Sequence, residues 1–238
     1  MILSSIRLLF AACFMILTAI GVVAVMPIDP HGKVFHGIAR FYSRTVLRFC
    51  GIKLRVEGLE NVDFSRSHIY VSNHASQFDI PAVIAGIPDQ IRIVYKKELE
   101  KVPFFGWGLK FPKVYIGIDR GGGQDAIQSL QAAAEKIRNG ASVLLFGEGT
   151  RSPDGRLQTF KRGAFNLAVK AGVPVVPLTI NGSYSILPKK SLRLRPGTIT
   201  LVLDKPIAPP QENGKETEMK LREQVESCIR QHYIDQAG

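Results

Sequence analysis

His74 and Asp79 lie five positions apart in the polar stretch SNHASQFD at residues 72–79. Apolar runs precede and follow this stretch, so a buried strand is expected to give way to a helix here. On a straight helix, residues five apart point about 140° away from each other, and the two side chains meet only if the chain turns between them. In such a turn, a carboxylate that binds one imidazole nitrogen leaves the other nitrogen to accept a proton. The spacing therefore predicts a general base.

Each residue of the pair also has a structural interpretation. Asp79 stands directly before Ile80 and Pro81, where an acidic side chain commonly caps a helix by accepting an orphan backbone N–H group. His74 alone is compatible with a loop histidine that has local hydrogen-bond partners. A helix cap beside a loop histidine is thus the alternative to a catalytic pair.

Arginines and glycines, together with polar residues, follow two more of the apolar runs. The first group begins at Arg120, before three glycines, and the second is the stretch GEGTRSPDGR at residues 147–156, followed by Lys161. Arginine beside glycine, which lets backbone N–H groups approach a ligand, is typical of phosphate-binding sites. The alternatives are solvated turn arginines and, for Glu148 with Arg151, a structural ion pair.

From residue 51 onward, short runs rich in β-branched residues alternate with amphipathic segments. Strands are expected within residues 52–58, 68–73, 91–96, 113–119, 141–147, 173–180 and 198–204, and helices within residues 123–140, 161–172 and 216–233. Apolar strands alternating with helices predict an α/β fold, with a mostly parallel sheet flanked by helices. Such sheets bind ligands at the carboxyl ends of their strands, where the polar groups described above are expected.

The first 50 residues differ in composition from the rest. Residues 8–28 contain no charged side chain, and Asp29 follows them directly. A helix of this length can span a bilayer. Residues 31–50 resemble an interfacial helix. A basic side chain recurs there at every fourth position, at His36, Arg40, Arg44 and Arg48. We expect N-terminal membrane-anchoring helices over residues 1–50 and an α/β domain over residues 51–238.

Positive charge is distributed unequally around the apolar segment. Only Arg7 precedes it, whereas several lysines and arginines follow it. Because cytoplasmic flanks carry the positive excess, we expect the α/β domain to face the cytoplasm at the inner membrane. The alternative is a signal peptide cleaved near Ala24.

The overall charge predicts an anionic partner. The 238 residues carry 31 Lys and Arg against 20 Asp and Glu, a formal net charge of +11, which suits phospholipid headgroups, a phosphorylated substrate or nucleic acid. Basic and aromatic residues are not interleaved as in a nucleic-acid module, so no nucleic acid is expected. The cysteines, Cys13, Cys50 and Cys228, are too few and too far apart for a disulfide framework or a zinc site.

Taken in order along the chain, these motifs resemble the glycerolipid acyltransferase family, in particular its 1-acyl-sn-glycerol-3-phosphate acyltransferases. NHASQFD at residues 73–79 matches the block N-H-x-x-x-x-D, and FGEGTRS at residues 146–152 matches F-P-E-G-T-R-S with Gly147 in place of the usual proline. The departure at Gly147 is expected to loosen that turn. Further similarity lies around I-D-R at residues 118–120 and in the segments 96–107 and 173–180.

The resemblance implies transfer of a fatty acyl group from acyl-CoA or an acyl carrier protein to the sn-2 hydroxyl of lysophosphatidic acid, with membrane lipids as the surroundings. It implies that His74 is the base and Asp79 its orienter. The implied acceptor-phosphate site comprises Arg120, Glu148, Gly149, Thr150 and Arg151, with Lys161 as a further candidate. A thioester is already activated, so no metal or other cofactor is expected.

Other functions remain open at this point. Within the same family, the acceptor could instead be glycerol 3-phosphate, another lysophospholipid or a lyso-ornithine lipid. A serine hydrolase is disfavoured because the chain lacks the G-x-S-x-G motif. A membrane-anchored basic protein that binds anionic lipid or nucleic acid through charge alone, without catalysis, is the alternative from a different class.

Overall fold

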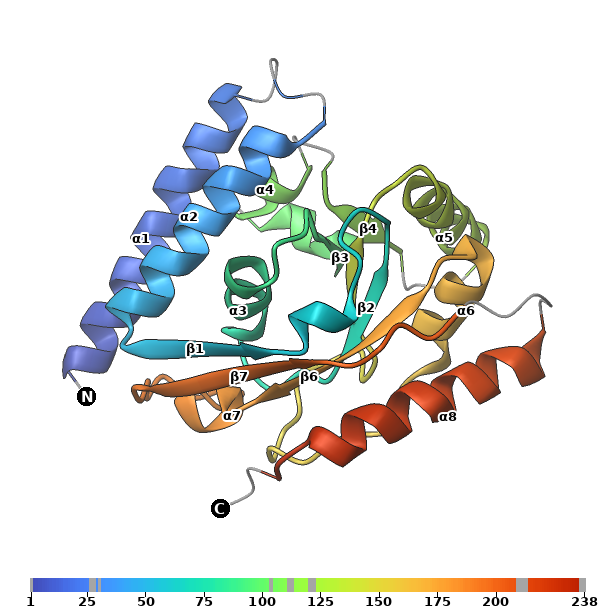
Figure 1. The fold of residues 1–238 in the computed structure, drawn as a ribbon. Coiled ribbons are helices and arrows are strands. Elements are labelled where there is room, and N and C mark those ends of the chain that lie inside the picture. The colour runs from blue at the N-terminus through green and yellow to red at the C-terminus, as the bar shows by residue number, and fades with distance from the viewer. Residues whose placement is uncertain are drawn as a thin grey trace.

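A single sheet forms the centre of the molecule (Figure 1). The computed structural model describes residues 2–25, 29, 31–102, 105–110, 114–119, 123–208 and 214–235. Within these residues the sheet has seven strands in the order β1-β7-β6-β2-β5-β3-β4. The strands are β1 (Ile52–Glu57), β2 (Ile69–Ser72), β3 (Arg92–Lys96), β4 (Ile116–Ile118), β5 (Val143–Phe146), β6 (Val175–Asn181) and β7 (Gly197–Leu203).

The predicted fold class is confirmed by the strand pairing. Every pair is parallel except β6 with β7, which run antiparallel. β7 is also parallel to β1, and it links this edge strand to the rest of the sheet. All seven strands form inside the ranges expected from the apolar runs, give or take a terminal residue.

Helices cover both faces of the sheet because the central strands are apolar on both sides. In β2, Ile69 and Val71 pack on one face and Tyr70 packs on the other. The face of Ile69 is covered by α5 (Gly123–Arg138), α6 (Arg162–Ala171) and α8 (Lys215–His232). The face of Tyr70 is covered by α2 (Lys33–Phe49), α3 (Asp79–Gly86) and the short α7 (Ser183–Ile186). The remaining short helices are η2 (Leu59–Asn61), η3 (Lys97–Lys101) and α4 (Phe105–Lys110).

The two predicted N-terminal helices, α1 (Ile2–Val25) and α2, lie side by side along one flank of the molecule (Figure 1). The Phe10 and Phe49 rings stack with centroids 3.9 Å apart, and the Tyr42 hydroxyl donates to the Ala11 carbonyl over 3.4 Å. Residues 2–24 have a mean hydropathy of 2.4, and 6% of the apolar window is buried. By length and composition this helix can cross or enter a membrane.

The basic stripe expected along α2 is wrong at two of its four positions. His36 is buried, and the Arg40 guanidinium donates hydrogen bonds to the Ile84 and Ile87 carbonyls at the end of α3. Those carbonyls lack helical partners, so an arginine that caps them fixes α2 on the α/β domain. Arg44 and Arg48 remain exposed. The boundary at residue 50 stays a prediction, although α2 contributes Val46 and Leu47 to the same core as the sheet.

Candidate active site

The turn between β2 and α3 is fixed by hydrogen bonds to distant parts of the chain. The Asn73 side chain donates to the Ile180 carbonyl and accepts from the Ile180 N–H, both over 2.8 Å. The Ser76 hydroxyl donates to the Leu187 carbonyl over 2.9 Å. Asn73 and Ser76 are both buried. Because the two ends of the turn are attached to β6 and to the segment after α7, the residues between them have little freedom to move.

His74 and Asp79 meet in this turn, as the catalytic interpretation predicts. The His74 Nδ1 atom lies 2.7 Å from Asp79 Oδ2, and the same oxygen accepts the backbone N–H groups of Ala75 and Ser76 over 2.8 and 2.9 Å. The Asp79 side chain is fully buried, whereas that of His74 is 15% exposed. The carboxylate thus holds the tautomer in which Nδ1 carries a proton, and Nε2 is left as the nitrogen that can act as a base.

The helix-capping interpretation of Asp79 is not what the structure shows. Asp79 is the first residue of α3, and Phe78 occupies the N-cap position. The hydrogen bonds of Asp79 Oδ2 run backwards into the turn rather than forwards into the helix. The turn of the chain between residues 74 and 79 therefore serves to bring the carboxylate to the imidazole.

One ring-stacking contact and one backbone hydrogen bond orient the imidazole further. The His74 ring stacks on Phe146 at the end of β5, with centroids 3.8 Å apart and planes 14° from parallel. The backbone N–H of Ser152 donates to the His74 carbonyl over 2.7 Å. The loop after β5 thus positions the loop after β2, because β2 and β5 are parallel neighbours whose carboxyl ends meet.

Glu148 supports the backbone of His74. Its Oε1 atom accepts the His74 backbone N–H over 2.9 Å, and the residue is 3% exposed. Within the described residues, Glu148 forms no ion pair with Arg151, so the structural ion pair is not observed. Burial, reinforced by the Asp79 charge and opposed by the His74 N–H, raises the pKa of the Glu148 carboxyl to about 8.

This pKa gives the protein a pH-dependent stability. The carboxyl keeps its proton in the folded state to about pH 8, but in the unfolded chain it loses it near 4.5. Between these values the folded state binds more protons, so the free energy of unfolding falls as pH rises. We expect Glu148→Gln, which retains the acceptor oxygen, to flatten the fall in Tm between about pH 5 and pH 8 by a few degrees.

The comparison is made by thermal unfolding in one detergent across that pH range. Glu57→Gln, at an exposed position of β1, is the matched control because it removes the same group from a solvated site. Identical pH profiles for the two variants would show that Glu148 does not titrate as described.

A cavity of about 690 Å³ opens in front of His74. Four of the predicted phosphate-site residues line it, namely Gly149, Thr150, Arg151 and Lys161. Glu148 is not among the described residues on its wall, and Arg120 lies outside the described residues. The cavity also has an apolar part, lined by Ile80, Ile93, Val94, Leu99, Ile118, Leu130, Leu145 and Leu167.

Sequence reasoning missed two charged residues near this cavity. Lys96, at the end of β3, lines its wall. Lys189 reaches from the segment after α7 to the Arg151 carbonyl over 2.9 Å and to the Thr150 hydroxyl over 3.3 Å. Lys96 belongs to the stretch at residues 96–107 that resembles the family, which was a usable signal. Lys189 had no such signal, because its contacts depend on the packing of distant segments.

The glycine that replaces the usual proline has a structural reason. A Cβ atom at Gly147 would lie 2.4 Å from the Phe160 ring, far inside contact distance. The Phe160 ring is 1% exposed and packs directly against this backbone. A side chain at this position would therefore have to displace Phe160. The looser turn expected at Gly147 stays a prediction.

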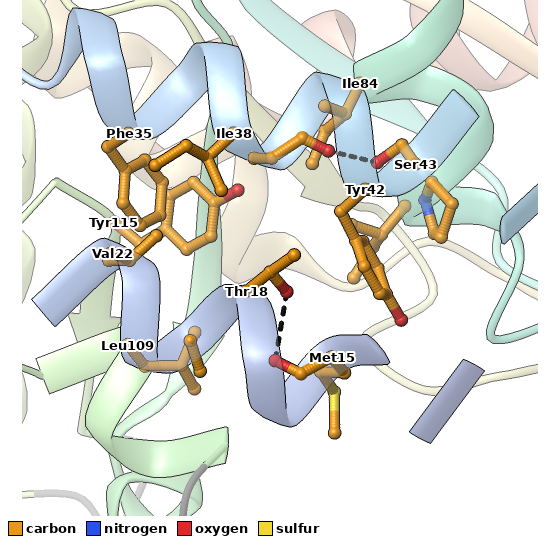
Figure 2. A pocket seen from close by; sticks show the side chains of 14 residues that line it. Met15, Thr18, Val22, Phe35, Ile38, Tyr42, Ser43, Ile84, Leu109 and Tyr115 are labelled. Carbon is orange, nitrogen blue, oxygen red and sulfur yellow. Dashed lines mark hydrogen bonds between the residues drawn. The ribbon is translucent and has the colours of Figure 1, made fainter. Parts of the chain in front are cut away.

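A smaller apolar cavity of about 150 Å³ lies between α1, α2, α3 and α4. Figure 2 shows Thr18 and Val22 of α1 opposite Phe35, Ile38 and Tyr42 of α2 around this space. Ile80, which directly follows Asp79, lines both this cavity and the large one. An apolar side chain that follows the His74–Asp79 pair thus borders both cavities.

The described residues contain no group of three or more His, Cys, Asp or Glu placed to hold a metal ion.

Comparisons with known proteins agree with the geometry. A family model described as acyltransferase matches residues 53–181. The chloroplast 1-acyl-sn-glycerol-3-phosphate acyltransferase LPAT1 of Arabidopsis thaliana is 34% identical over 199 residues, which cover 83% of this chain and 55% of the plant protein. The 1-acyl-sn-glycerol-3-phosphate acyltransferase of Pseudomonas aeruginosa is 36% identical over 181 residues, covering 75% of this chain and 68% of the bacterial protein.

A solved structure shares the fold over nearly the whole chain. The crystal structure of the 1-acyl-sn-glycerophosphate acyltransferase PlsC from Thermotoga maritima aligns with a TM-score of 0.75 and 27% identity, covering 97% of this chain and 96% of the other. The chain spans about half the length of several of the curated relatives it matches.

Proposed function

Because the chain belongs to the acyltransferase family, we propose that it transfers a fatty acyl group from an acyl thioester to the sn-2 hydroxyl of lysophosphatidic acid, forming phosphatidic acid. The observation that carries the proposal is the pairing of His74 with the buried Asp79 on the wall of a cavity that also presents Arg151 and Lys161. A base and a cationic phosphate site in one cavity suit an acceptor that carries both a hydroxyl and a phosphate. The names of the relatives support the same acceptor.

His74 acts as the base in this proposal. Its Nε2 atom takes the proton of the acceptor hydroxyl as the hydroxyl oxygen attacks the thioester carbonyl carbon. Asp79 stabilises the imidazolium that forms, since its Oδ2 atom is bonded to Nδ1. The tetrahedral intermediate then expels the thiolate, which receives the proton from Nε2. An ester bond forms, the thioester bond breaks, and the imidazole returns to its starting state.

The acceptor phosphate is held by Arg151 and Lys161, whose side chains line the cavity together with His74. Arginine is suited to this role because its planar fork donates two hydrogen bonds to a phosphate. Arg120 remains part of the proposed phosphate site on the strength of its motif. Holding the phosphate places the hydroxyl near Nε2 and so lowers the entropic cost of the reaction.

Arg151→Ala is expected to act mainly on acceptor binding. Losing a charge-assisted hydrogen bond should raise the KM for lysophosphatidic acid on the order of 10-fold to 100-fold. Arg151→Lys should recover only part of this, because an ammonium group cannot form the two-pronged contact. Steady-state kinetics at a saturating concentration of one acyl thioester measure both variants.

A second acceptor shows whether the contact that Arg151→Ala removes is a contact to the phosphate. With a lysophospholipid whose phosphate is a diester, Arg151→Ala should change the KM much less. Arg156→Ala is the matched control, since Arg156 is an exposed arginine of the same loop and is not among the described residues that line the cavity. An equal effect of Arg151→Ala on both acceptors would remove Arg151 from the phosphate site.

The acyl donor is acyl-CoA or an acyl carrier protein, and no metal or redox cofactor takes part, because the thioester supplies the activated carbonyl. The acyl tail lies in apolar space. The cavity between α1, α2, α3 and α4 (Figure 2) supports this, since it shares Ile80 with the catalytic cavity.

The protein works at the inner membrane, with the α/β domain on the cytoplasmic side. Support comes from the apolar α1, whose outer face exposes Leu9, Leu17 and Ile20. The positive charge that follows α1 supports the orientation. A membrane location also suits the reaction, since the lipid acceptor and the lipid product are both membrane constituents.

The function is tested by supplying the purified protein with one acyl thioester and a panel of acceptors in mixed micelles. Lysophosphatidic acid is expected to have the highest kcat/KM. A higher value for glycerol 3-phosphate, another lysophospholipid or a lyso-ornithine lipid would assign a different acceptor within the same family. Absence of thiol release with every acceptor would contradict acyl transfer altogether.

A further inference from the structure

The start of α1, the end of α2 and the start of β1 come together at one corner of the molecule (Figure 1). Each of these segments carries cationic side chains, four in all. Arg44, Arg48 and Lys53 line an open cavity of about 450 Å³, together with Gly51. The Nη2 atom of Arg7 lies 3.5 Å from the position that a Cβ atom would take at Gly51. Segments far apart in the sequence thus bring their positive charges to one place, which we call the basic corner.

The basic corner lacks compensating negative charge. The described residues that line its cavity include no acidic side chain. Within the described part of the chain, none of the four cations forms an ion pair, whereas Arg162 pairs with Glu218 elsewhere on the surface. Neighbouring cations repel one another, so binding of an anion between them lowers the electrostatic energy of the corner.

The surroundings of the basic corner indicate where that anion comes from. Ile2, Leu3 and Ile6 of α1 are 81%, 58% and 51% exposed beside Arg7, and Phe49 of α2 is 43% exposed beside Arg48. Ile2, Leu3 and Ile6 belong to the helix that is long and apolar enough to cross a membrane, and Phe49 stacks on Phe10 of the same helix. Cations that border a membrane-inserted apolar surface lie at the depth of the lipid headgroups.

We propose that the basic corner binds the phosphate headgroups of anionic phospholipids in the bilayer that α1 enters. The two arginines of α2 and Arg7 offer planar donors that match phosphate oxygens, and Lys53 adds a fourth charge. Among the described residues, none lines both its cavity and the catalytic cavity, so the corner is a separate site. The proposal rests on the membrane association of α1 but not on the identity of the acyl acceptor.

The test measures transfer of the full-length protein from dilute detergent to lipid vesicles. The vesicles consist either of phosphatidylcholine alone or of phosphatidylcholine with a minor share of phosphatidylglycerol. Wild-type protein should bind the anionic vesicles more tightly, and this gain should shrink as salt is added. The variant Arg44→Gln with Arg48→Gln should lose roughly 25-fold of the gain, about fivefold per cation, while its binding to phosphatidylcholine alone stays unchanged.

The matched control is Lys205→Gln with Lys215→Gln, which removes the same charge from exposed positions after β7 and at the start of α8. This control should keep the full preference for anionic vesicles. Equal loss in both double variants would show a general charge effect and overturn the site. An unchanged preference in the α2 variant would overturn it as well.

Three further measurements identify the source of the phosphate, test RNA as a competing ligand and check that the variant is folded. Inorganic phosphate, at the concentration of the accessible phosphatidylglycerol, should not displace the protein from vesicles; displacement would assign the corner to a soluble anion. Binding of RNA oligonucleotides that competes with the vesicles would contradict a lipid site. Acyl transfer between short-chain, water-soluble substrates should be the same in wild type and in the α2 variant, so failure of the proposed activity and failure of this site give different results.

Discussion

His74→Ala is expected to lower kcat for acyl transfer by a factor on the order of 10²–10⁴, the range typical of a general base. The loss should fall on kcat rather than on the KM for the acceptor, because the phosphate contacts remain. The backbone N–H of His74 that bonds to Glu148 is kept by alanine, and so is the carbonyl that accepts from Ser152. The turn should therefore stay folded, and only the imidazole and its stacking on Phe146 are lost.

Thermal unfolding and vesicle association of the variant should stay close to wild type, which separates a chemical defect from a folding defect. His232→Ala is the matched control, because His232 is also bonded to an aspartate but is exposed on α8. Turnover of His74→Ala within about tenfold of wild type would fall short of any general-base contribution and would remove His74 from the mechanism.

Asp79→Asn is expected to produce a loss of comparable size, on the order of 10²–10⁴ in kcat. An amide retains an oxygen that can accept the backbone N–H groups of Ala75 and Ser76. It cannot balance the positive charge of the imidazolium, and its N–H₂ group can present a donor to Nδ1 and so favour the wrong tautomer. The variant thus keeps the turn while impairing the base, and kcat with unfolding curves measures the two effects separately.

Asp63→Asn is the matched control for this experiment. Asp63 likewise accepts a backbone N–H, from Ser65 over 3.0 Å, but in an exposed turn. Full activity of Asp79→Asn would show that the carboxylate only holds the turn in shape. Full activity of Asp63→Asn is expected in every case.

Most of the sheet could be predicted from the sequence because its signals are local. Each of the runs within residues 68–73 and 141–147 places three consecutive apolar side chains in the cores on the two faces of the sheet, namely Ile69, Tyr70 and Val71, and Val143, Leu144 and Leu145. Such runs have few alternatives to a central parallel strand. The His74–Asp79 contact could be predicted for the same reason. Its two side chains are separated by a single turn, so spacing alone limits the geometry.

The contacts that complete the site could not be predicted in this way. Asn73 bonds to Ile180, and Lys189 bonds to the Arg151 carbonyl. Both depend on the order of strands in the sheet and on the path of the chain after β6, which local patterns do not encode. Glu148 illustrates the consequence, since its motif suggested a phosphate contact, whereas its carboxyl group accepts a hydrogen bond from the His74 backbone.

The N-terminal helices show the limit of periodicity. His36, Arg40, Arg44 and Arg48 are spaced for one face of a helix. In the structure, the first part of that face packs against the α/β domain, where Arg40 caps α3. The second part, with Arg44 and Arg48, is exposed to solvent. A regular spacing therefore identified the helix but not which of its charges face solvent.

The central claim is that His74 and Asp79 drive acyl transfer to the sn-2 hydroxyl of lysophosphatidic acid, and product analysis tests it most directly. The purified full-length protein receives an isotopically labelled acyl thioester and lysophosphatidic acid, and the label is located by mass spectrometry while free thiol is counted. We predict one labelled sn-2 acyl group in phosphatidic acid for each thiol released, and formation of both products by His74→Ala at a rate lower by a factor on the order of 10²–10⁴. Thiol release with labelled free fatty acid instead of phosphatidic acid, or formation of labelled phosphatidic acid by the variant at a rate within about tenfold of wild type, would contradict it.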